Sequence, residues 1–220
     1  AHIQFNCYGG KDWNSMESRA EEVAKSINST DKVTVDLGQI TFGETMFLSP
    51  DGCLVRRIAT LFKETPLSNR DFEIEDTCGG VKLTYSTDNL INSLQWAIGL
   101  ELALLIDDPW KLSLTTNSPS GGLFTKYPEV ICWLMSKEQR ETVLEKSPST
   151  LQRRSSIAAI EKGYDLYDIA VITRASPARA LGISKIKGHL GIGADADVAI
   201  YGLDPENLTP QSVSRAFSSA

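Results

Sequence analysis

The chain has 220 residues, of which 41% are hydrophobic and 23% are charged, and its formal net charge is −6. This composition is typical of a globular chain with one domain, or one large domain and an appendage, and it excludes an intrinsically disordered protein. Lys and Arg do not cluster among aromatic residues, which argues against nucleic-acid binding, and no apolar run is long enough to cross a membrane.

The first part of the chain predicts a strand, a helix and a second strand with short connections. Apolar and polar residues alternate over residues 1–5, and residues 14–17 have the pattern of a capping box. Apolar side chains then recur at helical spacing as far as Asn28, and the alternation returns over residues 32–37. This order predicts a βαβ unit of a parallel sheet.

Residues 38–87 are less regular and predict a long insertion of the kind that carries binding or partner surfaces. Within it, the spacing of apolar residues predicts a helix over 54–62, and alternation over 81–85 predicts a short strand or hairpin arm. A strongly periodic helix capped by Asp88 should follow and run to Leu105, and a strand should occupy residues 110–116.

The C-terminal half is predicted to be mainly helical. The expected elements are helices beginning at Pro128 and covering residues 137–146 and 165–173, one restarting at Pro177 and ended by Gly182, and a last strand over residues 197–201.

The stretch from Leu114 to Pro128 begins as a strand, opens into a loop rich in Ser, Pro and Gly, and closes at the start of a helix. Small polar side chains at the carboxyl end of a buried strand are typical of α/β active sites. An ordinary turn between a strand and a helix is the alternative.

Five separated motifs carry a family resemblance. Thr173–Gly182 and Lys187–Val198 resemble the C-terminal signature of the amidohydrolase superfamily. The runs His2–Gly10, Leu94–Leu102 and Leu114–Pro128 are similar to the A subunit shared by formylmethanofuran dehydrogenases and formyltransferase/hydrolase complexes.

The resemblance implies an α/β fold: strands six to eight of a metal-dependent-hydrolase TIM barrel, with a return strand to a small β-sandwich. Residues 1–183 would be the partial barrel, with its insertion at about 38–87, and residues 184–220 the sandwich segment. Because the chain enters a strand directly after Ala1 and contains only two histidines, too few for a binuclear metal cage, we expect it to be part of a longer protein.

The resemblance also implies zinc-dependent hydrolysis of the N-formyl amide of formylmethanofuran, or of a related formyl carrier, to formate in the one-carbon metabolism of methanogenesis or methylotrophy. Other subunits of a complex would be its partners, with neither membrane nor nucleic acid involved. The four cysteines lack CxxC spacing, so neither a disulfide framework nor a zinc knuckle is indicated, and a reducing cytoplasm is the simplest interpretation.

His2 is the candidate zinc ligand of this chain, with a core or capped histidine as the alternative. By the same resemblance Thr125, Lys126 and Tyr127 would contact substrate or hold the loop, and Lys126 would offer charge to an anionic substrate tail. His189 is predicted to be structural. The cysteines are predicted to be small core residues rather than nucleophiles.

Asn117 stands where the resemblance expects an Asp that touches the metal and transfers protons. An amide keeps an acceptor oxygen but cannot take up a proton at any working pH. We therefore expect an altered, slow site, and this chain alone to be inactive. An inactive scaffold subunit of such a complex, or an amidohydrolase acting on another amide, are the alternatives.

Overall fold

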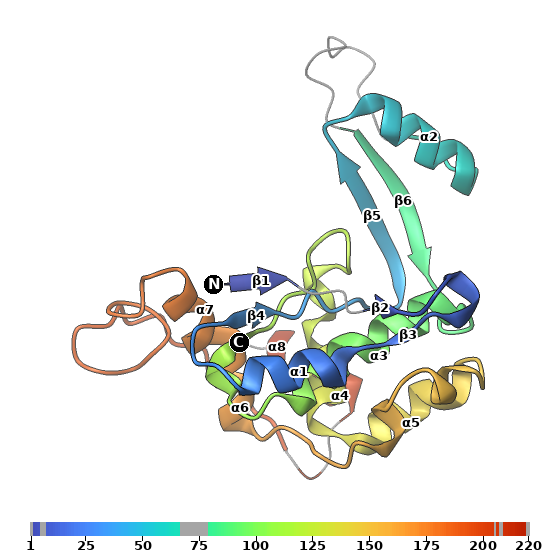
Figure 1. Cartoon of the computed structure of the whole chain (residues 1–220). Helices are drawn as coiled ribbons and strands as arrows, with labels where there is room; N and C mark the ends of the chain where they lie inside the picture. Colours follow the sequence, from blue (N-terminus) through green and yellow to red (C-terminus); the bar gives the residue numbers. More distant parts are fainter. Residues whose placement is uncertain (1, 5–7, 67–78, 205, 207–208, 219–220) are drawn as a thin grey trace.

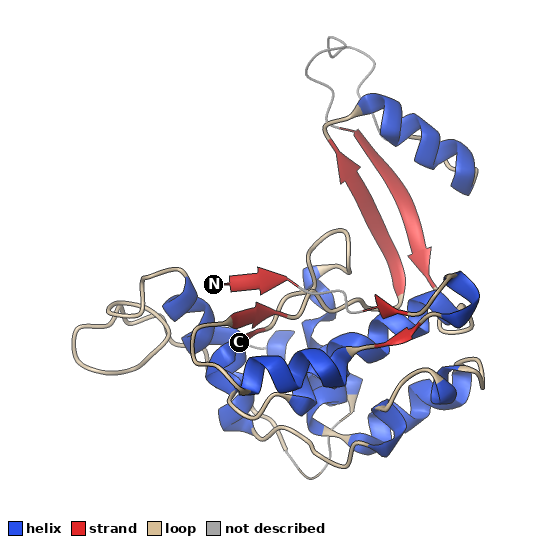
Figure 2. Ribbon diagram, viewed as in Figure 1, coloured by secondary structure: helices blue, strands red, loops and turns tan. Residues whose placement is uncertain are grey.

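A three-stranded parallel sheet lies at the centre of the computed structural model, which describes residues 2–4, 8–66, 79–204, 206 and 209–218. β4 (Thr34–Asp36) lies between β1 (His2–Gln4) and β7 (Leu112–Ser113), and all three run in the same direction. Figure 2 shows β1 and β4 side by side. The predicted order of parallel strands is therefore confirmed.

Helices connect these strands and cover one face of the sheet. α1 (Ala20–Asn28) connects β1 to β4, α3 (Leu90–Leu105) leads into β7, and the two helices pack against each other (Figure 1). α3 is buried along most of its length, because its own side chains are mostly apolar on every face of the helix. The remaining helices of the body are α4 (Tyr127–Met135), α5 (Lys137–Lys146), α6 (Leu166–Ala170), α7 (Ser176–Ala180) and α8 (Pro210–Ser218).

The insertion forms an arm, which we define as β5 (Gly43–Ser49), α2 (Gly52–Phe62) and β6 (Gly79–Tyr85). β5 and β6 pair antiparallel from Gly43↔Tyr85 to Ser49↔Gly79, and the arm projects from the body (Figure 1). The helix predicted over 54–62 is confirmed as α2, and the strand predicted over 81–85 is confirmed as β6. β5 was not predicted, because its sequence does not alternate cleanly between apolar and polar residues.

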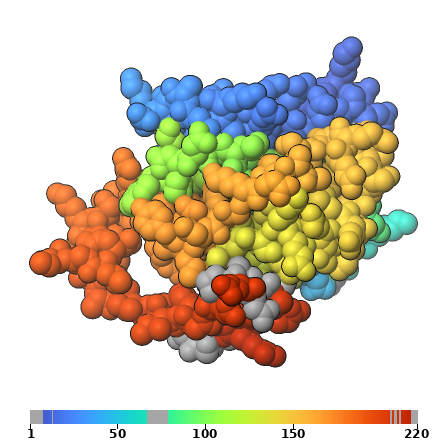
Figure 3. All heavy atoms as spheres, turned by 90° about the horizontal axis from the view of Figure 1, so that it is seen from below, coloured from blue at the N-terminus to red at the C-terminus, as the bar shows by residue number. Residues whose placement is uncertain are grey.

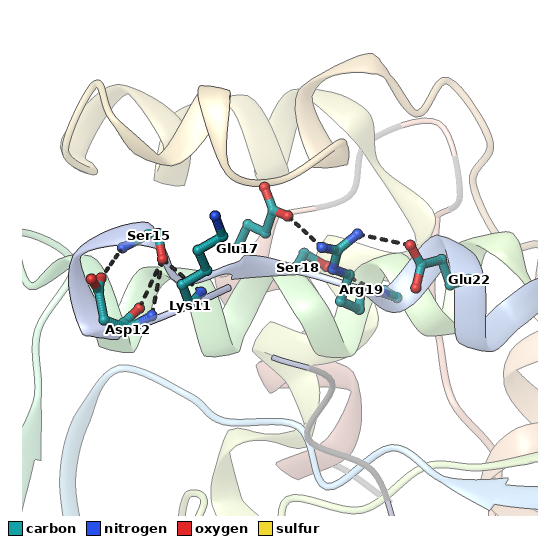
Figure 4. A network of polar contacts seen from close by, with 8 residues as sticks. Lys11, Asp12, Ser15, Glu17, Ser18, Arg19 and Glu22 are labelled. Atoms are coloured by element: carbon teal, nitrogen blue, oxygen red, sulfur yellow. Dashed lines mark hydrogen bonds and ion pairs between the residues drawn. The ribbon is translucent and has the colours of Figure 1, made fainter. Parts of the chain in front are cut away.

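The predicted capping box at residues 14–17 is wrong. Asp12 instead caps a short 3-10 helix (Trp13–Ser15), its Oδ1 accepting the Ser15 N–H at 2.9 Å. Glu17–Ser18 forms β3, which pairs with β2 (Tyr8–Gly9), so α1 begins only at Ala20. Figure 4 shows this network, in which Arg19 forms ion pairs with Glu17 and Glu22 at 2.9 and 2.8 Å.

Two further boundaries differ from the predictions for chemical reasons. Asn89, not Asp88, caps α3, because its Oδ1 accepts the Ile91 and Asn92 N–H groups at 3.0 and 3.2 Å. The strand predicted over 110–116 is shortened to β7, because Asp108 and the following proline start a 3-10 helix over Pro109–Lys111.

Helices α6 and α7 are continuous through a π-helical turn (Val171–Ala175), so no break separates the helix predicted over 165–173 from the one predicted to restart at Pro177. A proline has no N–H and clashes with the preceding turn of an α-helix. The wider turn before Pro177 accommodates that proline without ending the helix.

The return strand predicted over residues 197–201 is absent: these residues form no regular structure and lie in a loop that extends from the body after α7 (Figures 1 and 3). Val198 and Ile200 are 61% and 82% exposed. A strand forms only against a neighbouring strand, and the described residues provide no partner here. The C-terminal stretch from residue 210, for which no finishing element was predicted, forms α8.

A buried carboxylate connects three parts of the body. Glu101 of α3 accepts hydrogen bonds from the Ser18 hydroxyl of β3 and from both the backbone N–H and the hydroxyl of Ser156, the last at 3.1 Å. Its side chain is fully buried, and burial raises the pKa of the Glu101 carboxyl despite these donors.

We expect Glu101→Gln to remove a pH dependence of stability. The raised folded-state pKa means that the native chain holds this proton more tightly than the unfolded chain, so the free energy of unfolding falls as pH rises from the unfolded pKa through the folded one. Gln carries no charge, so the variant does not lose this stability. Its free energy of unfolding should therefore increase relative to that of the unsubstituted protein over the same pH window. Urea unfolding at a series of pH values measures this, and parallel curves would contradict it.

Candidate functional site

The carboxyl ends of the parallel strands bring two segments together. Beyond β4 and β7 the backbones continue side by side, since the Leu37 N–H donates to Ser113 O at 3.1 Å and the Gln39 N–H to Thr115 O at 2.8 Å. The Thr41 N–H then donates to Gly121 O at 3.0 Å. The loop over residues 114–122, which we call the central loop, is thus placed at the sheet edge where α/β enzymes bind ligands.

Asn117 occupies a tight turn of the central loop. Its φ of 48° is left-handed, a conformation that Asn and Asp tolerate better than other non-glycine residues. Its N–H donates to Thr115 Oγ1 at 3.0 Å, and its carbonyl oxygen accepts the Ser120 and Gly121 N–H groups at 2.7 and 3.1 Å. The Asn117 side chain is exposed, so the turn leaves it accessible at the surface of the described chain.

Glycines are required where the central loop meets its neighbours. A Cβ on Gly121 would lie 2.3 Å from the carbonyl oxygen of Thr116, and one on Gly122 would lie 2.1 Å from Thr41 Oγ1. Both distances are far below van der Waals contact. The Gly-Gly pair of the motif therefore allows the loop to pack against the segment that follows β4.

Two buried side-chain oxygen atoms, Thr116 Oγ1 in the central loop and Gln39 Oε1 in the segment beside it, have no hydrogen-bond partner in the described part of the chain. The amide nitrogen of Gln39 does bond, donating to Ile40 O at 2.8 Å and Trp96 O at 3.2 Å. Gln39 thereby fixes the segment after β4 onto α3.

The predicted substrate-contact residues follow the central loop at the start of α4. Thr125 is exposed, and Tyr127 Oη donates to Leu114 O at 3.3 Å. Lys126 forms an ion pair with Glu129 at 2.5 Å, so its charge already has a counter-ion within the chain. Tyr127 holds the loop in place, and substrate contact by the three residues stays a prediction.

The base of the arm also contacts the central loop. The Thr45 hydroxyl and the Met46 N–H both donate to Pro119 O, the second at 3.3 Å, and Tyr85 Oη donates to Ser120 O at 3.0 Å. Sequence reasoning missed these residues, because no local pattern links strands of an insertion to a loop far along the chain.

The described residues do not by themselves form a metal centre, since no group of three or more His, Cys, Asp or Glu side chains comes together among them. The backbone of His2 lies in β1 opposite Thr34, but its side chain lies outside what the structure describes. Metal ligation by His2 therefore stays a prediction.

The cysteines and His189 of the described ranges lie in different surroundings. Cys132 is fully buried, and burial raises the pKa of its thiol to about 12, as expected for a core residue. Cys53 is exposed, so the core interpretation is wrong for it, and Cys7 and Cys78 lie outside the described residues. His189 is a turn residue whose Nδ1 accepts the Gly191 N–H at 3.0 Å, consistent with a structural role.

The chain is similar in sequence to two known proteins. The chain is 44% identical over 217 residues to Protein FwdA of Methanocaldococcus jannaschii, covering 98% of this chain and 38% of that protein. It is 39% identical over 210 residues to the A subunit of the formyltransferase/hydrolase complex Fhc of Methylorubrum extorquens, covering 91% and 37%. The chain thus spans less than two fifths of the length of these relatives.

A solved structure and a family model match almost all of the chain. The crystal structure of the formyltransferase/hydrolase complex FhcABCD from Methylorubrum extorquens, in complex with methylofuran, contains a chain that matches with a TM-score of 0.81 and 37% identity. That match covers 99% of this chain and 39% of the other. The model of the amidohydrolase family matches residues 2–216, and the chain belongs to that family.

Proposed function

We propose that this chain is part of the A subunit of a formylmethanofuran dehydrogenase or formyltransferase/hydrolase complex that hydrolyses the N-formyl amide of formylmethanofuran, or of a related formyl carrier, to formate. The observation that carries the proposal is the match over 99% of the chain to one subunit of a complex solved with methylofuran. Other subunits of that complex are the proposed partners, and a reducing cytoplasm is the proposed location.

In this proposal β1, β4 and β7 are strands six, seven and eight of a (β/α)8 barrel. Their adjacency, common direction and helical connections support that assignment. The central loop then lies at the carboxyl end of the barrel, where such enzymes place their catalytic groups.

Zinc is the metal that the family resemblance implies. Because the described residues form no metal centre of their own, we propose that ligands elsewhere in the longer protein complete the site, with His2 as the contribution of this chain. The span of less than two fifths of the relatives' length leaves room for those ligands.

In this proposal Asn117 takes the position of the Asp that transfers protons in the family, but its amide cannot transfer a proton. Its exposed amide can hold a water molecule or the formyl group by hydrogen bonds, but it cannot accept a proton and return it to the leaving nitrogen. We therefore propose a site that binds its substrate and turns it over slowly.

The second candidate function is that of a catalytically inactive scaffold subunit. Exposed apolar side chains on the arm favour it: Leu61 and Phe62 at the end of α2 are 69% and 57% exposed. Exposed apolar residues that lie together mark protein contacts. In this case the arm and the surface around α5 would bind neighbouring subunits.

Zinc content and formate release, measured together on the intact protein in its complex, separate the two candidates. Zinc bound in stoichiometric amount with slow formate release from formylmethanofuran would support the altered enzyme. Absence of both would support the scaffold, and hydrolysis of a different amide alone would support an amidohydrolase of other specificity. Turnover as fast as that of Asp-bearing relatives would contradict the role given to Asn117.

A further inference from the structure

The arm has the appearance of an independent appendage. It projects from the body and has a small apolar core of its own around Val55, Ala59 and Val81 (Figure 1). At its base, however, both of its strands bind the central loop that presents Asn117.

The arm holds two consecutive carbonyl groups of the central loop. From β5, the Thr45 hydroxyl and the Met46 N–H donate to Pro119 O. From β6, Tyr85 Oη donates to Ser120 O at 3.0 Å. Thr45 is only 4% exposed, and burial raises the pKa of the Tyr85 hydroxyl, so water competes weakly for these bonds.

The same two peptide groups are bonded to Asn117 on their other side. The N–H groups of Ser120 and Gly121 belong to the peptide units whose carbonyls the arm holds, and both donate to Asn117 O. A peptide unit is a rigid plane, so a displacement of its carbonyl also displaces its N–H. The position of the arm is therefore transmitted through two rigid units to the backbone of Asn117.

We infer that Thr45 and Tyr85 are positioning residues for Asn117, through which the arm sets the geometry of the central loop. This inference rests on the proposed function for the importance of residue 117, but the contacts themselves do not depend on it. An event that moves the base of the arm, such as the binding of another subunit, would move Asn117 with it.

Hydrogen exchange of the Ser120 and Gly121 amides in the intact protein tests the inference without an activity assay. Thr45→Val and Tyr85→Phe each remove one hydroxyl and keep the shape of the side chain. We expect each to accelerate exchange at these two amides roughly five-fold, the effect of one ordinary hydrogen bond on local opening.

Two matched controls separate positioning from general loss of stability. Tyr164 Oη donates to Ala103 O in the helical body, so Tyr164→Phe removes the same kind of bond away from the loop. Thr84 is an exposed residue of β6, so Thr84→Val makes the same chemical change on the arm outside the contact. Equal acceleration in the controls, or none in Thr45→Val and Tyr85→Phe, would overturn the inference.

Kinetics in an Asn117→Asp background give a second test. When Thr45→Val or Tyr85→Phe is added to this variant, the carboxylate of residue 117 should be misplaced. The kcat should then fall by up to about 100-fold while KM stays unchanged. A rise in KM with unchanged kcat would instead place Thr45 and Tyr85 in substrate binding and overturn the inference. If the Asn117→Asp protein releases no formate at all, the proposed function fails, while the exchange comparison still decides the role of the arm.

Discussion

Asn117→Asp should raise the rate of formate release from formylmethanofuran by about 10²–10⁴-fold, the usual contribution of general acid–base catalysis. The substitution adds a group that can carry a proton where the native amide cannot. The backbone should accept it, because Asp tolerates the φ of 48° and residue 117 makes its turn bonds to Thr115, Ser120 and Gly121 through its main chain. Single-turnover measurements on the complex would separate the chemical step from binding.

Ser118→Asp is the matched control for this prediction. It adds the same charge to the same exposed part of the loop, one residue away from the required position. If both variants gain equally, the gain is electrostatic and not proton transfer. If Asn117→Asp gains nothing while zinc is bound, the assignment of residue 117 as the proton-transfer position is wrong. The rate of the active variant should also increase with pH as the new carboxyl ionises, a dependence that Asn117 cannot produce.

Arg140→Ala should lower the free energy of unfolding by about 3–5 kcal/mol, the largest stability effect that we expect of a single substitution. Arg140 of α5 is 1% exposed, and its guanidinium donates to three carbonyl oxygens: Trp133 O at 2.8 Å, Ile160 O at 2.9 Å and Lys162 O at 3.0 Å. Truncation would leave these carbonyls without a donor. The loss stays below the sum of three charge-assisted bonds because the desolvation cost of the buried cation disappears with it.

Chemical denaturation of Arg140→Ala, Arg140→Lys and Arg153→Ala would measure this effect. Lys retains the charge but not the planar fork, so it should recover only part of the loss. Arg153 is exposed, and its truncation should change stability by less than about 0.5 kcal/mol. A loss for Arg140→Ala no larger than that of Arg153→Ala would show that the three buried bonds contribute nothing net.

Features that depend on neighbouring residues in the chain were predictable. The periodicity of residues 90–105 indicated α3, and alternation around Val35 indicated β4, because side-chain direction in helices and strands follows from local backbone geometry. The Gly-Gly pair and Pro128 likewise marked the central loop and the start of α4. Predictions failed where a distant partner was needed, as for the return strand over residues 197–201.

The N-terminal part of the body shows the same limit. Residues 14–17 have a capping pattern, yet the Ser18 hydroxyl bonds to the buried Glu101 carboxylate, 83 positions along the chain, and the segment is extended there. A local pattern cannot reveal that a carboxylate from another helix binds the residue just after it, or that residues 17 and 18 pair with β2.

By itself, the sequence determined the strand–helix alternation, the central loop and the presence of an amide rather than a carboxylate at residue 117, since all of these follow from residue identity and short-range backbone preference. Only the tertiary structure decided that the arm holds this loop. The bonds from Thr45 to Pro119 and from Tyr85 to Ser120 join residues 74 and 35 positions apart. Such contacts depend on how the packed elements are arranged in space. Local sequence patterns do not predict that arrangement.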